Sequence, residues 1–158
     1  MNTITLTPIG TVQQLDGRPA IIIAPPCRPA LLGLAGYGHV QVLWWADRCD
    51  NPADRRTLVE AKPYKRGPDR LGVFALRSPE RPNPVAVSNA PLAAVDEAAG
   101  IVFLHYIDAF PGTPVLDLKP YTPSLDRIEH PVTPEWCRHW PRSVEESADF
   151  DWAAEFNF

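Results

Sequence analysis

Cysteines and long apolar runs are both scarce in this chain, and each shortage excludes a class of protein. The 158 residues include three cysteines, Cys27, Cys49 and Cys137, without a C-x-x-C pair. This odd and widely spaced set predicts neither a disulfide framework nor a zinc ribbon, and it favours reduced thiols. The longest apolar stretches, such as residues 20–26, are far shorter than the about 20 residues of a membrane-spanning helix. Residues 1–11 lack the basic and apolar regions of a signal peptide, so we expect a cytoplasmic protein that does not bind a membrane.

Several motifs that mark cofactor or catalytic sites are also absent. The sequence has no P-loop and no G-x-S-x-G elbow, and its nearest approach to G-x-G-x-x-G, at residues 36–41, lacks the third glycine. His130, Cys137 and His139 lie close together in the sequence, but no fourth ligand is evident. We therefore expect neither a Rossmann cofactor site nor a metal site.

The net charge is slightly negative, at −4. A chain of this charge does not bind polyanions over its whole surface, so a nucleic-acid partner requires a local basic patch. Residues 60–82 offer one, because they contain six Lys or Arg against three Asp or Glu. This segment is either a phosphate-facing patch or a solvated loop, and composition does not separate the two.

Proline is abundant, with 19 residues among 158 against a usual share of about 5 %. Because proline fixes φ and removes a backbone donor, long helices and central strands cannot pass through it. We expect a mainly β fold, a small closed or partly open β-barrel of six or seven strands with short helices. A brief helix is expected at residues 29–36. The predicted strands span residues 3–12, 20–24, 39–45, 71–76, 85–95, 101–107 and 115–118.

Residues 129–158 differ in composition from the rest of the chain. Thr133 followed by Pro134 is typical of a helix start, and SVEE at residues 143–146 has the form of a capping box. This segment also holds six large aromatic residues, namely Trp136, Trp140, Phe150, Trp152, Phe156 and Phe158. We expect a barrel domain at residues 1–128 and a helical aromatic tail at residues 129–158 that docks on the barrel or on a second subunit.

A strand running into a proline-rich segment at residues 72–88 is the stretch most typical of a ligand site. Prolines at positions 79, 82 and 84 restrict the residues that precede them, Ser78, Arg81 and Asn83, to extended conformations. Polar side chains held on a stiff backbone lose little freedom on binding, and arginine supplies planar donors for a carboxylate or a phosphate. By composition alone, the segment is equally typical of a proline-rich surface loop.

The same segment, GVFALRSPERPNPVAVS, resembles the signature GVFATRSPxRPNPIGLS of the TsaA/TrmO-like family of S-adenosylmethionine-dependent methyltransferases. Residues 37–45 (YGHVQVLWW) and residues 112–121 (GTPVLDLKPY) are similar to two further family motifs, in the same order along the chain. The opening residues 8–12 (PIGTV) also fit. The resemblance covers residues 4–123, and three ordered motifs of this length are a specific signal.

The resemblance implies a β-barrel, a homodimer and a pocket for S-adenosylmethionine unlike a Rossmann site. The family's best-known activity methylates threonylcarbamoyladenosine beside the anticodon of certain tRNAs, which implies tRNA as the partner. Asp47 stands where relatives have His, and Pro111 where they have Asp. By position in the family's motifs, the residues implied to contact the cofactor are Asp47, Arg48, Arg77, Val87, Asp108, Ala109, Phe110 and Pro111.

The side of the site that would face the acceptor is expected on the strand at residues 115–118 and just beyond it. Alternation along a strand places Asp117, Lys119 and Tyr121 on one face. One hypothesis is that they face the acceptor and that Asp117 or Tyr121 removes the departing proton. The other is a structural ion pair and a structural tyrosine. The residues expected to bind the acceptor are Lys62, Lys65, Arg66, Arg81 and Lys119.

Three functions remain open at this stage. The first is a tRNA methyltransferase, whose tRNA binding should weaken steeply with salt. The second is a methyltransferase for a small molecule, which the negative net charge and the altered cofactor contacts favour. The third is a non-catalytic module that binds the cofactor or RNA without turnover, which the loss of the Asp before Gly112 keeps open.

Overall fold

The structure is a computed structural model that describes residues 3–157, and the chain divides into two compact units. The first, called here the barrel unit, comprises Met1–Asp50 and Pro84–Arg127. The second, the insertion–tail unit, comprises Asn51–Asn83 and Ile128–Phe158. A segment inserted between two barrel strands thus groups with the C-terminal residues. The sequence predicted a barrel domain at residues 1–128 and a tail at residues 129–158, and it did not predict that residues 51–83 group with the tail. The predicted domain boundary itself stays a prediction.

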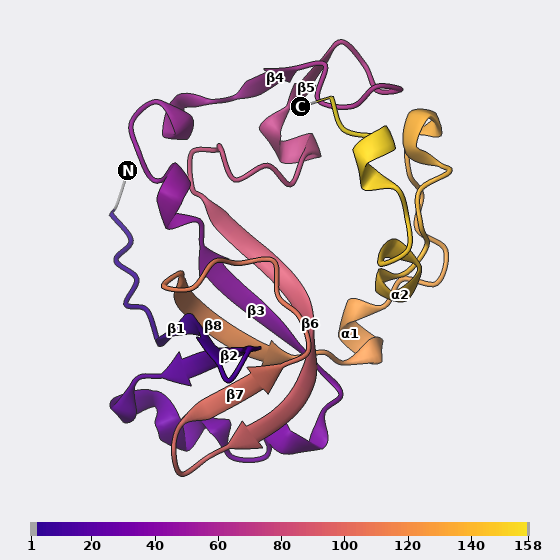
Figure 1. The fold of residues 1–158 in the computed structure, drawn as a ribbon. Helices are drawn as coiled ribbons and strands as arrows, with labels where there is room; N and C mark the ends of the chain where they lie inside the picture. The colour runs from indigo at the N-terminus through magenta and orange to yellow at the C-terminus, as the bar shows by residue number, and fades with distance from the viewer. Residues whose placement is uncertain (1–2, 158) are drawn as a thin grey trace. The chain divides into compact units, whose positions relative to one another are not determined.

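The barrel unit is built on six strands, each paired with two neighbours in an antiparallel ring. The ring has the order β1-β2-β7-β6-β3-β8 and closes where β8 pairs with β1. Figure 1 shows how β6 bends, so that its first part runs beside β3 and its last part beside β7. This architecture confirms the predicted mainly β fold. The strands are β1 (Gly10–Leu15), β2 (Arg18–Ile23), β3 (His39–Trp45), β6 (Val85–Asp96), β7 (Ile101–Leu104) and β8 (Pro114–Pro120).

Gly10 lies at the point where the ring closes. It pairs with Ile23 of β2 on one side and with Val115 of β8 on the other. A Cβ atom at this position would lie 2.3 Å from the carbonyl oxygen of Ile22. Only glycine lets two backbones approach this closely, so the closure of the barrel explains the glycine of PIGTV.

The barrel core is formed by alternate residues of the strands. Val12, Ile21, Val40, Val102 and Val115 are completely buried. All five are β-branched, and such side chains pack well on a pleated surface. Because successive residues of a strand point to opposite faces, the residues between these core positions face out of the barrel. Several of the candidate site residues lie on this outer face.

Some strand boundaries follow the predictions closely, whereas β7 ends at Leu104 rather than at residue 107 and the first strand also differs. β3 coincides with residues 39–45, and β6 and β8 agree with their predictions to within two residues. The first strand begins at Gly10 rather than at residue 3, and Pro8, just before it, has no N–H to donate to a ladder. Proline within β6, at Pro91, is tolerated where its pairing passes from β3 to β7.

The helices of the described residues are short, in line with the proline content. The helix predicted at residues 29–36 is instead part of two 3-10 helices, separated by Gly33 at a φ of 84°. The α-helices are α1 (Pro123–Asp126) and α2 (Val144–Ser147). The 3-10 helices are η1 (Pro25–Leu31), η2 (Leu34–Gly36), η3 (Asp47–Cys49), η4 (Asp54–Arg56), η5 (Val73–Ala75), η6 (Glu135–Cys137) and η7 (Trp152–Ala154).

The insertion–tail unit holds a two-stranded sheet of β4 (Val59–Ala61) and β5 (Arg70–Gly72). The sequence pattern predicted a single strand over residues 71–76 and missed β4. The prediction was wrong beyond Gly72, because the chain turns there into η5, in which Leu76 N–H donates to the carbonyl of Val73 at 3.2 Å. β4 is three residues long, and its sequence VEA is too short for its alternation to be told from a loop.

The C-terminal residues of this unit pack around the loop between β4 and β5. Tyr64 of the loop lies among the rings of the tail, with centroid distances of 5.1 Å to Trp136, 4.9 Å to Trp140 and 5.7 Å to Phe156. Half of the capping box predicted at residues 143–146 is present, since the Ser143 hydroxyl accepts from the Glu146 N–H at 3.2 Å. The Glu146 carboxylate accepts from the Arg142 N–H at 2.9 Å and not from that of Ser143. The aromatic residues of the tail therefore serve as the core of this unit.

Candidate functional site

The end of β3 places Asp47 and Arg48 at the surface of the barrel unit. The strand passes into η3 at Asp47, and the preceding residue Ala46 is buried and donates its N–H to the carbonyl of Pro84 at 2.8 Å. This hydrogen bond fixes where the short helix leaves the barrel. Both Asp47 and Arg48 are exposed, so their side chains are free to meet a ligand.

The loop between β7 and β8 carries Asp108, Ala109, Phe110 and Pro111. It is anchored by the buried side chains of Ile107 and Thr113 at its two ends. Gly112 has a φ of 92°, which favours glycine, and its N–H donates to the carbonyl of Val12 at 2.8 Å. Between these anchors Asp108 is exposed and the ring of Phe110 is 58 % exposed.

A contact between Arg48 and Phe110 joins these two segments. The Cζ atom of Arg48 lies 3.7 Å from the centroid of the Phe110 ring, which is a cation–π arrangement. The two residues are 62 positions apart in the sequence. They come together because Arg48 follows β3, Phe110 precedes β8, and these two strands are paired. Stacking on the ring leaves the N–H groups at the edge of the guanidinium available as donors.

Val87 lies on β6 beside the same end of β3. It pairs with Leu43, which on its other side pairs with Asp117 of β8. Directly paired residues share a face, so Val87, Leu43 and Asp117 are neighbours on the outer face of the barrel. Val87 is 42 % exposed, and an exposed valine on a paired strand suits an apolar ligand contact.

The outer face of β8 holds Asp117 and Lys119, and Tyr121 follows directly after the end of the strand. Lys119 Nζ lies 2.6 Å from Asp117 Oδ2, and Tyr121 N–H donates to the carbonyl of His39 at 3.1 Å. The rings of His39 and Tyr121 have centroids 6.3 Å apart. The ion pair places Asp117 and Lys119 side by side, while a common face that includes Tyr121 stays a prediction. The same contacts are also the ion pair and structural tyrosine of the alternative hypothesis.

The chemistry of the barrel-unit residues fits the cofactor that the resemblance implies. S-adenosylmethionine carries a carboxylate, an ammonium group, ribose hydroxyls and an adenine ring. Arg48 can donate to a carboxylate, and Asp47 and Asp108 can accept from the ammonium group or the hydroxyls. Within residues 3–157, neither carboxylate has a hydrogen bond or an ion pair to another side chain. The Phe110 ring and Val87 add the apolar surface that small-molecule sites require.

The charge of Asp108 also affects the neighbouring Tyr106. Burial raises the pKa of the Tyr106 hydroxyl above its ordinary value, and the carboxylate of Asp108 raises it further. The Tyr106 hydroxyl is an O–H donor at neutral pH with or without this shift, and the residue is 64 % exposed. Sequence reasoning did not single out Tyr106, and no motif in the chain marks it.

Arg77 and Arg81 belong to the insertion–tail unit. Arg77 is exposed and has no hydrogen bond or ion pair in the described part of the chain. Arg81 instead donates to three backbone carbonyls, with Nη2 2.7 Å from Val73 O and 2.6 Å from Leu76 O, and Nε 2.8 Å from Ser78 O. Of the two arginines, Arg77 is free for a ligand and Arg81 holds the loop.

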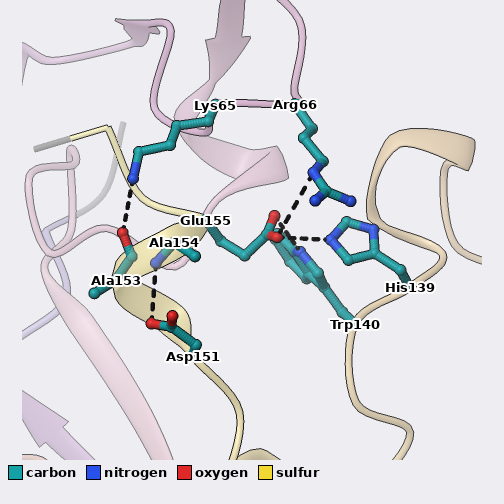
Figure 2. Close-up of polar contacts among 8 residues, drawn as sticks. All are labelled: Lys65, Arg66, His139, Trp140, Asp151, Ala153, Ala154 and Glu155. Carbon is teal, nitrogen blue, oxygen red and sulfur yellow. Dashed lines mark hydrogen bonds and ion pairs between the residues drawn. The ribbon is translucent and has the colours of Figure 1, made fainter.

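The three candidate phosphate-binding residues of the β4–β5 loop all contact groups of their own unit. Lys62 Nζ donates to the carbonyl of Gly67 at 2.8 Å, and Lys65 Nζ to that of Ala153 at 2.8 Å. Figure 2 shows Arg66 directed at Glu155, with Nε 4.0 Å from Oε1. Lys65 and Arg66 thus contact the tail, whereas the Lys62 side chain contacts its own loop. All three keep their positive charges.

Two further properties of the described residues bear on the predicted site. Among residues 3–157 there is no group of three or more His, Cys, Asp or Glu side chains placed to hold a metal ion. No helix in this part of the chain combines the length and the apolar character needed to span a bilayer.

Comparison with known proteins places the chain in a family. Residues 3–127 match the family model of the tRNA-methyltransferase O N-terminal domain. A probable S-adenosyl-L-methionine-binding protein of Halobacterium salinarum is 46 % identical over 93 residues, which are 59 % of this chain and 67 % of the relative. The human tRNA (adenine(37)-N6)-methyltransferase is 31 % identical over 124 residues, 75 % of this chain but 27 % of the human protein.

Solved structures show the same relationship. The crystal structure of TrmO from Pseudomonas aeruginosa superposes with a TM-score of 0.65 and 28 % identity, and the match covers 85 % of this chain and 62 % of that one. The chain thus spans about a quarter of the human relative and less than two thirds of the bacterial structure. The chain belongs to the family of the tRNA-methyltransferase O N-terminal domain.

Proposed function

We propose that this chain is an S-adenosylmethionine-dependent methyltransferase that acts on tRNA. The proposed acceptor is the exocyclic nitrogen of threonylcarbamoyladenosine next to the anticodon. The observation that carries the proposal is the contact between Arg48 and Phe110, because it joins two segments that the resemblance independently assigns to the cofactor. The similarity to the human tRNA (adenine(37)-N6)-methyltransferase supports the acceptor class, and that to the probable S-adenosyl-L-methionine-binding protein of Halobacterium salinarum supports the cofactor. A homodimer and a cytoplasmic location are proposed with it.

The proposed cofactor site uses the exposed residues at the ends of β3 and β7. Arg48 is the candidate partner for the cofactor carboxylate, and Asp47 and Asp108 are candidates for its ammonium group or ribose hydroxyls. Arg77, in the other unit, is a further candidate for the carboxylate by its position in the family motif alone. When bound, the cofactor supplies a methyl group made electrophilic by its sulfonium. The residues of the chain have to orient it toward the acceptor atom and keep water out.

The proposed acceptor site lies on the outer face of β8. Asp117 or Tyr121 would take the proton that leaves the acceptor nitrogen. The Asp117 carboxylate accepts hydrogen bonds from the Leu118 N–H at 2.9 Å and from Lys119, which hold it in one orientation. Lys119 is the candidate phosphate contact of this unit. In the other unit, Lys62, Lys65 and Arg66 are candidate phosphate contacts by their charge, and Arg81 holds the backbone of its own loop.

Calorimetric titration with S-adenosylmethionine and with its demethylated product tests the cofactor site. We expect micromolar binding in the wild type and a sharp loss in Arg77→Ala and Arg48→Ala. Arg127→Ala, which removes an exposed arginine outside the proposed site, should bind normally. No binding of either ligand by the wild type would overturn the proposal.

Transfer of a labelled methyl group tests the acceptor. tRNA that carries threonylcarbamoyladenosine should be labelled, and tRNA without the modification should not. Labelling of a metabolite pool but not of tRNA would indicate a small-molecule methyltransferase instead. Cofactor binding without any transfer would indicate a non-catalytic module. If Asp117→Asn and Tyr121→Phe both keep wild-type turnover, neither residue removes the proton.

A further inference from the structure

Phe74 is an aromatic side chain that the fold leaves in solvent. It lies in η5, and 87 % of its surface is exposed. Its neighbours in sequence show that this exposure is not a loose loop, because Val73 and Leu76 are buried at 1 % and 7 % exposure. An exposed phenylalanine held between two core residues is unusual, and exposed apolar surface of this kind is typical of a binding site.

The backbone around Phe74 is fixed by hydrogen bonds on both sides. Val73 N–H donates to the carbonyl of Leu58 at 3.0 Å, and Arg81 Nη2 donates to the carbonyls of Val73 and Leu76. A phenylalanine on so rigid a turn has two side-chain torsions left to restrict, so little entropy is lost when a ligand covers it.

The segment that carries Phe74 has further exposed apolar side chains and a positive net charge. Leu58 and Val59 on the adjoining segment are 60 % and 46 % exposed, and Val59 pairs directly with Gly72 of β5. The whole segment of residues 51–83 contains eight Lys or Arg against four Asp or Glu, a net charge of +4 in a chain of net charge −4. Its charge is complementary to a polyanion that also exposes flat apolar rings.

We propose that Phe74 is a stacking platform for an unpaired base of a single-stranded RNA loop, with Leu58 and Val59 forming the rest of its apolar surface. Unpaired bases stack on exposed aromatic side chains while nearby arginine and lysine residues meet the phosphates, and bases inside a duplex cannot do so. This inference rests on the proposed function, since it names how that function would hold its RNA. It adds a residue that neither the acceptor-binding set nor the cofactor-binding set contains.

The test compares the binding of a fluorescent hairpin RNA with an unpaired loop and of a blunt duplex of equal charge. We expect Phe74→Ala to weaken hairpin binding about tenfold or more and to leave duplex binding unchanged. Phe74→Trp should restore binding, because it keeps the ring. The salt dependence should not change, since no charge is removed. Leu32→Ala is the matched control, as Leu32 is 82 % exposed in the barrel unit.

The outcomes separate this proposal from the proposed function. Equal hairpin binding by Phe74→Ala and wild type, or no hairpin binding by wild type, would overturn the stacking platform. If Phe74→Ala instead changes the oligomeric state in analytical ultracentrifugation while hairpin binding stays the same, the patch joins two copies of the chain. Ring-dependent hairpin binding without methyl transfer to tRNA would keep the platform and reject the methyltransferase.

Discussion

The Nε2 atom of His139 lies 2.8 Å from Oε1 of Glu155, whose side chain is only 5 % exposed. The second carboxylate oxygen accepts from Nε1 of Trp140 at 3.2 Å, and Arg66 approaches the first from the β4–β5 loop. Figure 2 shows this carboxylate at the centre of the three side chains. A single acidic residue near the C-terminus therefore ties the basic loop to the aromatic tail.

The pH dependence of stability should report this carboxylate. The hydrogen bond from His139 holds the pKa of Glu155 below its ordinary value of 4.5, with Trp140 and Arg66 acting in the same direction and burial opposing them. A carboxyl whose pKa is lower in the folded state stabilises the fold above pH 4.5, and this contribution is lost as the pH falls through the folded value. Glu155→Gln should therefore unfold more easily than wild type at pH 7, and the difference should shrink below pH 4.5.

Thermal unfolding of Glu155→Gln and wild type between pH 3 and pH 8 checks this expectation. Glu129→Gln removes an equal charge from an exposed position of the same unit, so it controls for net charge. A difference between Glu155→Gln and wild type that stays constant across the whole range would contradict the assigned role.

Gly10→Ala should destabilise the barrel strongly. The added methyl group would meet the backbone carbonyl of Ile22 at 2.3 Å, and a backbone atom cannot rotate away as a side chain does. We expect a loss of about 2 kcal/mol or more in the free energy of unfolding, as for other overpacked positions. Gly36→Ala, where a Cβ would meet nothing within 4 Å, should unfold like wild type in the same urea titration.

Arg81 should act through its geometry rather than through its charge. A lysine keeps the charge but cannot reach three carbonyls from one planar group, so Arg81→Lys should behave nearly like Arg81→Ala. Losing these partly buried, charge-assisted hydrogen bonds should cost about 2 kcal/mol. Hydrogen exchange over residues 73–78 measures the effect locally. If Arg81→Lys retains wild-type protection, the charge alone is sufficient and the positioning role is rejected.

Local sequence patterns were sufficient for the barrel and insufficient for the second unit. Residues 39–45 alternate in and out of a core and read directly as a strand, and β3 has those limits. The insertion–tail unit instead joins residues 51–83 to residues 128–158. Its organising contacts, such as Lys65 to Ala153, link positions too far apart in the sequence for any periodicity to show.

The same distinction holds for the candidate site. Motif positions pointed to residues 47–48 and 108–111, and the structure adds the contact between Arg48 and Phe110. The motif could not show that the Arg81 guanidinium donates its hydrogen bonds to the backbone of its own loop. An arginine in a proline-rich segment is equally suited to binding a phosphate and to binding a carbonyl. Phe74 stands inside the recognised motif, but its exposure is a property of the turn and not of the pattern.

Cys137 should be the slowest of the three cysteines to react with iodoacetamide in the folded protein. It is buried, and burial raises the pKa of its thiol above the ordinary value of 9.0, so the reactive thiolate is rarer and harder to reach. Cys27 is only partly buried and is the internal reference. Mass spectrometry of the alkylated peptides at pH 8 gives both rates in one sample, and in guanidinium chloride the two should become alike. Equal rates in the native protein would mean that the packing of the tail around Cys137 opens as readily as the barrel surface around Cys27.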